Sequence, residues 1–148
     1  MQKAEAIRFL EIAQGHSFSF ETVLSIKEKL DFIKHAKFNG YRVSVFYVST
    51  ENPDINIKRI KTRVKQGGHN VPEDKIISRY KKSMELMYDV IREADFAAVY
   101  DNSGSEVTCI AGKVGGIYFH INQPPNWFKK YFMTKAETDN IEIKEILN

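Results

Sequence analysis

The sequence predicts an α/β fold, in which a mainly parallel sheet is flanked by helices and followed by a C-terminal β-hairpin and a helical tail. Segments with strand periodicity alternate with segments with helical periodicity over most of the chain, which is typical of βαβ units and a parallel sheet. The run YRVSVFYV (residues 41–48) is nearly continuous in β-forming residues, as in strands buried on both faces. The 148 residues suit one domain with a substantial core.

The N-terminal third is expected to contain a helix, a strand and a second helix. Apolar residues share one helical face over residues 3–14, and Gly15 ends that helix. Phenylalanine and threonine alternate with polar residues over 17–22, which is strand period. Ser25-Ile26-Lys27-Glu28 is a capping-box pattern, so the second helix is expected to begin at Ser25 and to stop at Asn39-Gly40.

Two helices and a strand are expected next. Asn52-Pro53 predicts the start of a helix over 54–66, which Gly67-Gly68 ends. Apolar residues recur at alternating steps of three and four from Ile77 to Ala94, so residues 73–94 form the longest predicted helix. Phe96–Tyr100 follows as a short strand and ends at a dense turn signal, Asp101-Asn102-Ser103-Gly104.

The C-terminal third predicts a hairpin and a tail. Strands are expected at 106–111 and 117–121, around a turn from Gly112 to Gly116. After Pro124-Pro125, the aromatic cluster Trp127, Phe128, Tyr131 and Phe132 indicates two short helices or a packed arm. Such a cluster can stack on bases, but it more often packs on a core, and we favour packing. The expected division is a domain over 1–122 and a helical tail over 123–148 that packs on it.

Composition excludes several classes of protein. The chain is 43% apolar and 28% charged, with a net charge of +3, as in ordinary globular proteins. No apolar run approaches the roughly 20 residues that span a bilayer, so no membrane partner is expected. The single cysteine, Cys109, permits no intrachain disulfide, and a cytoplasmic location is expected. The four histidines lack metal-ligand spacing, so no metal site is predicted.

Positive charge is concentrated around one joint. Residues 58–82 hold nine Lys or Arg against two acidic residues, and Gly67-Gly68 lies between the two basic segments. On one interpretation, the glycines stop a helix and the basic side chains form a solvated face. On the other, the glycines are the hinge of a lid that closes over phosphates, as arginine forks can. The side chains of that lid would be Arg63, Lys65, His69 and Arg79.

Polar residues also follow the predicted strands. Glu21, Ser49-Thr50 and Asp101-Asn102 fall at carboxyl ends, where ligands bind in open α/β sheets. Glu21 could accept a hydrogen bond from a substrate hydroxyl, or it could simply be exposed. Spacing alone favours simple exposure.

Three stretches together resemble one family. FSFETVLS, RVKQGGHNVPEDKIISRYKKS and AAVYDNSG occur in the order and spacing of the zeta-toxin-like P-loop kinases, and the resemblance covers about residues 1–104. It implies a P-loop-kinase-like parallel sheet and transfer of the γ-phosphate of ATP, with Mg²⁺, to a hydroxyl. In the zeta toxins proper, that hydroxyl belongs to a UDP-activated amino sugar.

The resemblance also implies roles for particular residues. Glu21 matches the acid that binds substrate, and Thr22 follows it. Arg63 and Arg79 match the catalytic arginines that contact phosphate. The nucleotide would be contacted by Lys65 and His69, with Asp101 and Asn102 near its base. The family often has a second threonine where this chain has Val23, which weakens the assignment of the same sugar substrate.

The phosphate-binding loop of such kinases, G-x-x-x-x-G-K-[ST], is absent from the sequence. Gly112-Lys113 is followed by Val114 and lies in the predicted hairpin, so it does not qualify. The family's catalytic aspartate, which lies just after that loop, is absent as well. The sheet is therefore expected to be incomplete at the N-terminus, lacking a strand between 17–22 and 42–48.

The binding free energy lost with the phosphate-binding loop determines which function is expected. About three hydrogen bonds to charged phosphate, at roughly 1.5–3 kcal/mol each, are missing, whereas a micromolar ligand is held by only about 8 kcal/mol in total. The chain is expected to be part of an ATP-dependent kinase and to be inactive alone, with a nucleotide, a small-molecule substrate, and an antitoxin protein or a missing N-terminal segment as partners. The alternative is a non-catalytic remnant that binds an anion, a nucleotide or a protein. Nucleic-acid binding through 58–82 is a weaker alternative.

Overall fold

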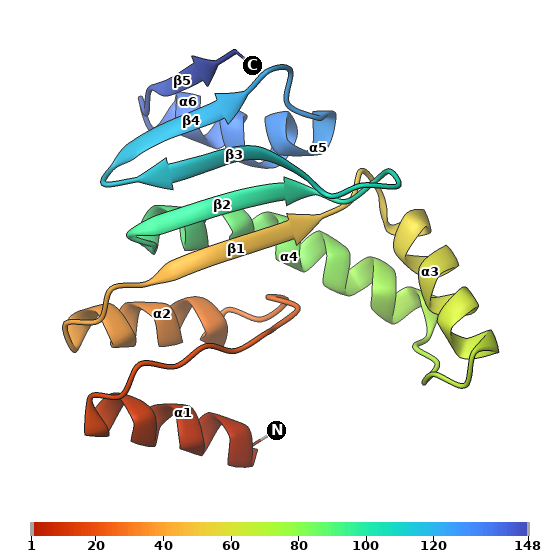
Figure 1. Ribbon diagram of the computed structural model, residues 1–148, viewed down its shortest axis with the longest axis horizontal. Helices are drawn as coiled ribbons and strands as arrows, with labels where there is room; N and C mark the ends of the chain where they lie inside the picture. Colours follow the sequence, from red (N-terminus) through yellow and green to blue (C-terminus); the bar gives the residue numbers. More distant parts are fainter. Residues whose placement is uncertain (1, 148) are drawn as a thin grey trace.

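The computed structural model describes residues 2–147 and confirms the α/β class (Figure 1). One five-stranded sheet has its strands in chain order, namely β1 (Ser44–Ser49), β2 (Phe96–Asp101), β3 (Thr108–Val114), β4 (Ile117–Ile121) and β5 (Ile143–Ile146). The longer helices are α1 (Gln2–Gln14), α2 (Glu28–Phe38), α3 (Pro53–Lys65) and α4 (Glu73–Glu93). Three short helical segments follow the hairpin, namely α5 (Asn126–Phe128), the π-helical η1 (Lys129–Met133) and α6 (Thr134–Thr138).

The sheet is mixed, so the expectation of a mainly parallel sheet is wrong. β1 and β2 run parallel, as do β4 and β5, whereas β3 is antiparallel to both of its neighbours. The connections explain the difference: α3 and α4 link β1 to β2, but short loops join β2 to β3 and β3 to β4, and short loops can join only antiparallel strands.

The predicted helices α3 and α4 are confirmed, and their local causes are visible. The Asn52 side chain accepts a hydrogen bond from the Asp54 amide at 3.1 Å and so caps α3, with Pro53 at its first position. On α4, Met84, Met87 and other apolar side chains are buried against the sheet. The periodic pattern therefore marks the face of α4 that packs.

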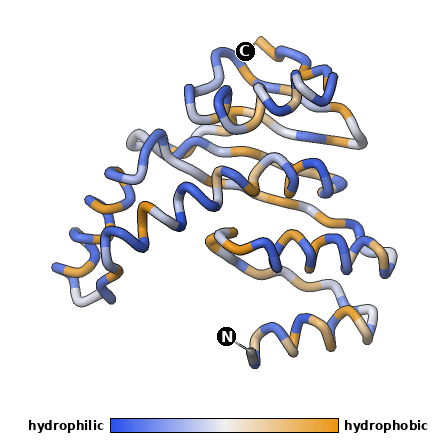
Figure 2. Tube along the Cα trace, turned by 180° about the vertical axis from the view of Figure 1, so that it is seen from behind, coloured by the Kyte–Doolittle hydropathy of each residue, from blue (hydrophilic) through white to orange (hydrophobic). Residues whose placement is uncertain are grey.

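The helices α4, α5, η1 and α6 lie on one face of the sheet, as Figure 1 and the view from behind in Figure 2 show. Trp127, Phe128 and Phe132 are buried there with the apolar face of α4, so the aromatic cluster packs on the core as expected. The tail also contributes a strand, because β5 pairs with β4 at the edge of the sheet. The tail thus contains the expected short helices, but β5 was not predicted.

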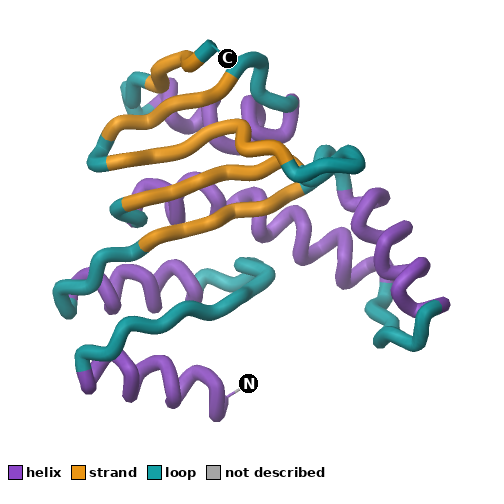
Figure 3. The backbone as a smooth tube through the Cα atoms, viewed as in Figure 1, coloured by secondary structure: helices purple, strands orange, loops and turns teal. Residues whose placement is uncertain are grey.

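The opposite face of β1 is uncovered, although the sequence predicts burial on both faces. Phe46 is 65% exposed and Val48 is 53% exposed, and the Phe46 ring lies 5.8 Å from the ring of Phe96. No helix lies over this face in Figure 3. A run of β-forming residues indicates that a strand forms, but it does not provide the layer that would bury both faces.

The predicted strand over 17–22 is also wrong: this segment is extended but pairs with no strand. Its aromatic residues pack instead between α1 and α2, where Phe18 contacts a small second core around Phe32. Alternation of aromatic and polar side chains gives the segment two different faces, but a β-strand also needs a neighbouring strand to which it is hydrogen-bonded.

The helix α2 begins at Glu28, three residues after the predicted start at Ser25. Leu24 adopts a left-handed φ of 54° and is buried in the main core, and the chain forms a turn before the helix begins. No side chain caps α2, so the capping-box prediction is wrong.

The hairpin is confirmed, but its turn is shorter than predicted. β3 continues to Val114, and only Gly115-Gly116, both with positive φ, form the turn. Gly112 lies inside β3 for another reason, because a Cβ there would lie 2.7 Å from both the Ala97 carbonyl oxygen and the Phe119 ring. Lys113 is therefore a strand residue, consistent with the rejection of Gly112-Lys113 as a phosphate-binding loop.

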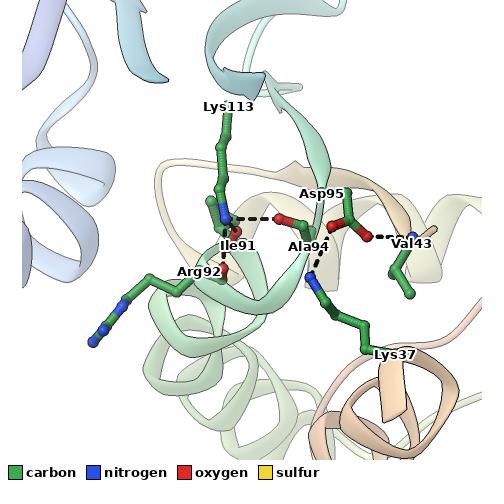
Figure 4. A network of polar contacts seen from close by, with 7 residues as sticks. All are labelled: Lys37, Val43, Ile91, Arg92, Ala94, Asp95 and Lys113. Atoms are coloured by element: carbon green, nitrogen blue, oxygen red, sulfur yellow. Dashed lines mark hydrogen bonds and ion pairs between the residues drawn. The ribbon is translucent and has the colours of Figure 1, made fainter. Parts of the chain in front are cut away.

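A buried lysine joins the sheet to the end of α4 (Figure 4). Lys113 extends from β3, and its Nζ donates hydrogen bonds to the carbonyl oxygens of Ile91 (3.4 Å), Arg92 and Ala94 (2.7 Å). These carbonyls lack partners within the helix because they lie at its C-terminus. Burial lowers the pKa of Lys113.

An ion pair beside this lysine fastens α2 to the start of β2 (Figure 4). Asp95 accepts hydrogen bonds from Lys37 Nζ and from the Val43 amide, each at 2.8 Å. Both bonds stabilise the charged carboxylate, the one from Lys37 most strongly, and so lower the pKa of Asp95.

Candidate functional site

A hollow of about 1420 Å³ lies between the extended segment 18–24 and strand β1. It continues past Thr50 and Asn102, the residues that follow β1 and β2, to the facing sides of α3 and α4. The hollow therefore includes the carboxyl ends of the parallel strand pair, where the sequence predicts a ligand site.

Glu21 and Thr22 line one wall of this hollow and are exposed. The Thr22 hydroxyl accepts a hydrogen bond from the Leu24 amide at 3.3 Å, which fixes the bend of the segment. Within residues 2–147 the Glu21 carboxylate makes no hydrogen bond or ion pair. Among the described residues that line the hollow it is the only carboxylate, and it is available to accept a hydrogen bond from a ligand.

Three arginines line the far end of the hollow. Arg63 lies in the last turn of α3, Arg79 lies in the first half of α4, and Arg59 lies one turn before Arg63 on the same face of α3. The structure thus brings Arg63 and Arg79 into the same hollow as Glu21. Sequence reasoning missed Arg59, although its spacing of four from Arg63 was available as a signal. Arg59 also donates to the Gly104 carbonyl at 3.3 Å.

Lys65 and His69 are exposed and are not among the residues that line the hollow. Lys65 is the last residue of α3, and His69 lies in the loop beyond it. The structure therefore does not bring these two predicted nucleotide-binding residues together with Arg63 and Arg79.

The Gly67-Gly68 joint is a helix cap. The Gly67 amide donates to the Val64 carbonyl and the Gly68 amide donates to the Arg63 carbonyl, each at 3.0 Å, which is the Schellman pattern. Gly67 has φ of +90°, and a Cβ on Gly68 would lie 2.7 Å from Arg63 Cγ. Both glycines therefore have a structural reason to be there, and this geometry supports the helix-stop interpretation.

Substitution of Gly67 with alanine is expected to lower the free energy of unfolding by about 1–2 kcal/mol, because a Cβ is strained at positive φ. Urea unfolding followed by circular dichroism measures the change. The matched control is Gly104→Ala, at an exposed loop position where a Cβ meets open space, and its expected effect is within about 0.5 kcal/mol. Equal effects of the two substitutions would contradict the role of Gly67 as a cap.

Asp101 and Asn102 have different surroundings. The Asp101 carboxylate accepts hydrogen bonds from Trp127 Nε1 at 3.1 Å and from the Ser103 hydroxyl at 2.6 Å, so it connects the end of β2 to the tail. Asn102 lines the hollow, and its amide donates to the Ser49 carbonyl at 2.7 Å. Of this predicted pair, only Asn102 lines the hollow.

Tyr80 is a further residue of the site that sequence reasoning took only as part of the packed face of α4. Its hydroxyl donates to the carbonyl oxygens of Thr50 at 2.8 Å and Glu51 at 3.0 Å. Burial raises the pKa of Tyr80, so the phenol stays protonated and keeps these bonds over the neutral range. Tyr80 thereby fixes α4, and with it the neighbouring Arg79, against the end of β1.

Neither a cluster of metal-binding side chains nor a membrane-spanning helix is found in residues 2–147. Residues 2–147 contain no group of three or more His, Cys, Asp or Glu side chains that could hold a metal ion. Among the helices in the described part of the chain, none is long and apolar enough to cross a membrane.

The fold and the hollow define the class of protein: an α/β protein with a cleft at the carboxyl ends of parallel strands, the position at which this class binds ligands. Residues 4–110 match the family model described as zeta toxin, and the chain belongs to the zeta toxin family. This is a kinase-like, ATP-using family. The suspected resemblance is thus confirmed, and β4, β5 and the short helices lie outside the match.

The chain is 38% identical over 79 residues to an uncharacterized protein of Haemophilus influenzae, an alignment that covers 53% of this chain and 56% of that protein. The chain thus spans about half the length of the curated relative that it matches. No solved structure matches the chain.

Proposed function

We propose that the chain is the part of an ATP-dependent, zeta-toxin-type kinase that binds the acceptor and the phosphates, with a fold of the P-loop-kinase kind. The complete enzyme would transfer the γ-phosphate of ATP to a hydroxyl of a small molecule. One observation carries the proposal: Glu21 and Thr22 line the same hollow as Arg59, Arg63 and Arg79. A carboxylate suited to binding an acceptor and arginines suited to binding phosphate thus line one space.

The chemistry of these groups fits phosphoryl transfer. A carboxylate at the lip of the hollow can accept a hydrogen bond from the acceptor hydroxyl and orient it. Arginine guanidinium groups remain charged at all relevant pH values and can contact two phosphate oxygens at once. In phosphoryl transfer, arginines so placed stabilise the charge of the transferring group. The pair Arg63 and Arg79 would have this role, with Arg59 beside them.

The chain alone is expected not to turn over substrate. Within residues 2–147, Glu21 is the only carboxylate that lines the hollow, so this part of the chain offers no second acid there to activate the hydroxyl. The sequence lacks the glycine-rich cradle whose amides hold the phosphates. The Mg²⁺ that the family implies finds no cluster of acidic ligands within residues 2–147. Phosphate binding therefore depends on the arginines.

The acceptor is expected to be a small hydroxyl compound, with a UDP-amino sugar as the reference ligand. Val23 is exposed beside Glu21 and Thr22 at the lip. The valine side chain has a methyl group where a threonine would have its hydroxyl, so this side chain cannot form a hydrogen bond with a sugar. An acceptor with one polar contact fewer at this position fits the lip better.

Arginine substitutions are expected to weaken ATP binding. Arg63→Gln and Arg79→Gln should each raise the dissociation constant of ATP by about tenfold, the loss expected for one charge-assisted hydrogen bond. Calorimetric titration of the 148-residue chain measures the constants. The matched control is Lys82→Gln, an exposed cation on α4 that does not line the hollow, and it should change the constant less than twofold. Equal affinity in all four proteins would overturn the proposal.

A non-catalytic remnant that binds only anions is the second candidate, and the single carboxylate in the hollow favours it over turnover. Titration with a UDP-amino sugar separates the two. The proposed kinase part binds the sugar nucleotide in a way that Glu21→Gln weakens. A mere anion site binds it no better than inorganic triphosphate, and Glu21→Gln then strengthens binding by removing a negative charge.

A further inference from the structure

We propose that the outer edge of β5 pairs with the same edge of a second copy of this chain, so that two sheets join into one. The two β5 strands would run antiparallel about a two-fold axis at Ile143. This inference goes beyond the proposed function, because β4 and β5 lie outside residues 4–110, which match the family, and contribute no residue to the lining of the hollow.

The strand β5 is an open edge of the sheet. It is the last strand in the sheet order, and Figure 1 shows it outermost. Its neighbour β4 runs parallel to it, and on that side the Ile146 carbonyl accepts a hydrogen bond from the Asn122 amide at 3.0 Å. Because successive residues of a parallel strand direct their backbone groups to alternate sides, Ile143 and Glu145 direct theirs outward. Such outward groups are a template for a further strand.

Symmetry restricts how two β5 strands can pair. Residues that lie opposite each other in an antiparallel pair have their side chains on the same face. Because side chains alternate along a strand, a two-fold axis must pass between two identical residues. Direct hydrogen bonds at the axis need outward backbone groups, which Ile143 and Glu145 have. An axis at Glu145 would place two glutamates opposite each other, which is destabilising, so the axis is expected at Ile143.

The charges on either side of Ile143 are complementary across this axis. Glu142 lies opposite the partner's Lys144, and by symmetry Lys144 lies opposite the partner's Glu142. Both side chains are exposed, and within residues 2–147 neither forms an ion pair. Charged side chains usually keep edge strands from pairing. Here their order disfavours the register at Glu145 and favours the one at Ile143, which makes a second copy the fitting partner.

The other face of β5 and its backbone also suit this register. Ile143 is partly buried against the main core, so its contact with the partner's Ile143 would join the two cores across the axis. The two Ile143 residues would exchange hydrogen bonds, and each Glu145 amide would donate to the partner's Ile141 carbonyl. The Ile141 amide already donates to the Ala136 carbonyl at 2.8 Å, so it adds no bond. The contact is small, so the chain is expected to be a monomer when dilute and to associate when concentrated.

Sedimentation of the 148-residue chain as a function of concentration tests the proposal. The mass is expected to rise toward twice that of the monomer between about 10 µM and 1 mM. Lys144→Glu and Glu142→Lys should each weaken association by about tenfold, because each turns two opposite-charge pairs into like-charge pairs. The matched control is Lys58→Glu, the same charge change at an exposed position on α3, and it should alter association less than twofold.

An equal mixture of the two charge variants gives the sharpest result. One chain then carries glutamate at both positions and the other carries lysine at both, so the charges of a mixed pair are complementary again. The mixture should therefore associate at least as tightly as the unchanged chain. A dimer that Lys144→Glu does not weaken, or a mixture of folded variants that does not associate, would overturn the proposal, because the contact would then lie elsewhere.

Amide hydrogen exchange of the unchanged chain is an independent readout that needs no variant. Raising the concentration should slow exchange at Ile143 and Glu145 but not at Lys144, whose amide faces β4. A monomeric mass up to about 1 mM, with exchange at Ile143 independent of concentration, would overturn the proposal. ATP takes no part in these measurements, so this proposal and the kinase proposal fail separately.

Discussion

Replacement of Phe128 with alanine is expected to lower the free energy of unfolding by about 3–5 kcal/mol, as for other buried aromatic side chains. Phe128 is 1% exposed and stacks on Phe132 with ring centroids 4.9 Å apart. Its ring also meets Trp127 edge to face at 5.9 Å. The substitution leaves a cavity where the short helices pack against α4. Chemical unfolding followed by tryptophan fluorescence measures the change.

The matched control is Phe38→Ala, because the Phe38 side chain is 91% exposed and its loss should change stability by less than about 0.5 kcal/mol. If Phe128→Ala does not fold, Phe128→Leu provides a milder cavity, with an expected cost of about 1 kcal/mol. A Phe128→Ala protein as stable as the control would contradict the packing described above. Phe128 lies beyond residues 4–110, the part of the chain that matches the family. The expected result would therefore show that residues outside the match stabilise the fold.

Replacement of Lys113 with methionine is expected to lower the free energy of unfolding by about 2–4 kcal/mol. The lysine is 7% exposed, and its ammonium donates to three carbonyl oxygens at the end of α4. Methionine keeps the apolar stem but leaves those carbonyls without a donor, and each buried unsatisfied group costs about 1–3 kcal/mol. Thermal and urea unfolding both measure this loss.

Lys144→Met serves as the control for this substitution, because Lys144 is an exposed strand residue on β5. Its expected effect is within about 0.5 kcal/mol. Amide exchange adds a local readout: in Lys113→Met, exchange should speed up most in the last turn of α4. Uniform acceleration over the whole chain would show that the lysine stabilises the fold without capping this helix.

The helices that follow clear start signals could be predicted from sequence, and the structure shows why. Asn52-Pro53 encodes the start of α3 within a few residues, through a side-chain bond that needs no distant partner. The face of α4 could be predicted because burial follows helical period over 21 residues. The Ser25 pattern misled because burial of Leu24, a tertiary effect, bends the chain just before the cap could form.

The errors in the sheet share one cause, which is that pairing depends on neighbours that are remote in sequence. Alternation at 17–22 suits a strand, but no strand lies beside it in the described chain. Gly112 looks like a turn residue, yet it is needed because Phe119 and Ala97 approach it closely. β5 is a short run of mixed polarity, and only its pairing with β4 makes it a strand.

The candidate site could be predicted in part. Glu21, Arg63, Arg79 and Asn102 line one hollow, as residues at strand ends and on facing helices should. Lys65 and His69 were chosen for charge and position in the chain, and neither gives the direction in which a side chain points. Asp101 was chosen for its place at a strand end, but its carboxylate is engaged by Trp127, which lies 26 residues away.

The position of the aromatic core residues also has a consequence during synthesis. Trp127, Phe128 and Phe132 complete the main core, and they are synthesised after all the residues of β1 and β2. The core therefore cannot form while β1 and β2 emerge from the ribosome. The apolar side chains of these two strands stay exposed, and prone to aggregation, until the later residues follow. Translation speed and chaperone supply should then influence the yield of this protein more than that of a chain whose strands are covered as soon as they are synthesised.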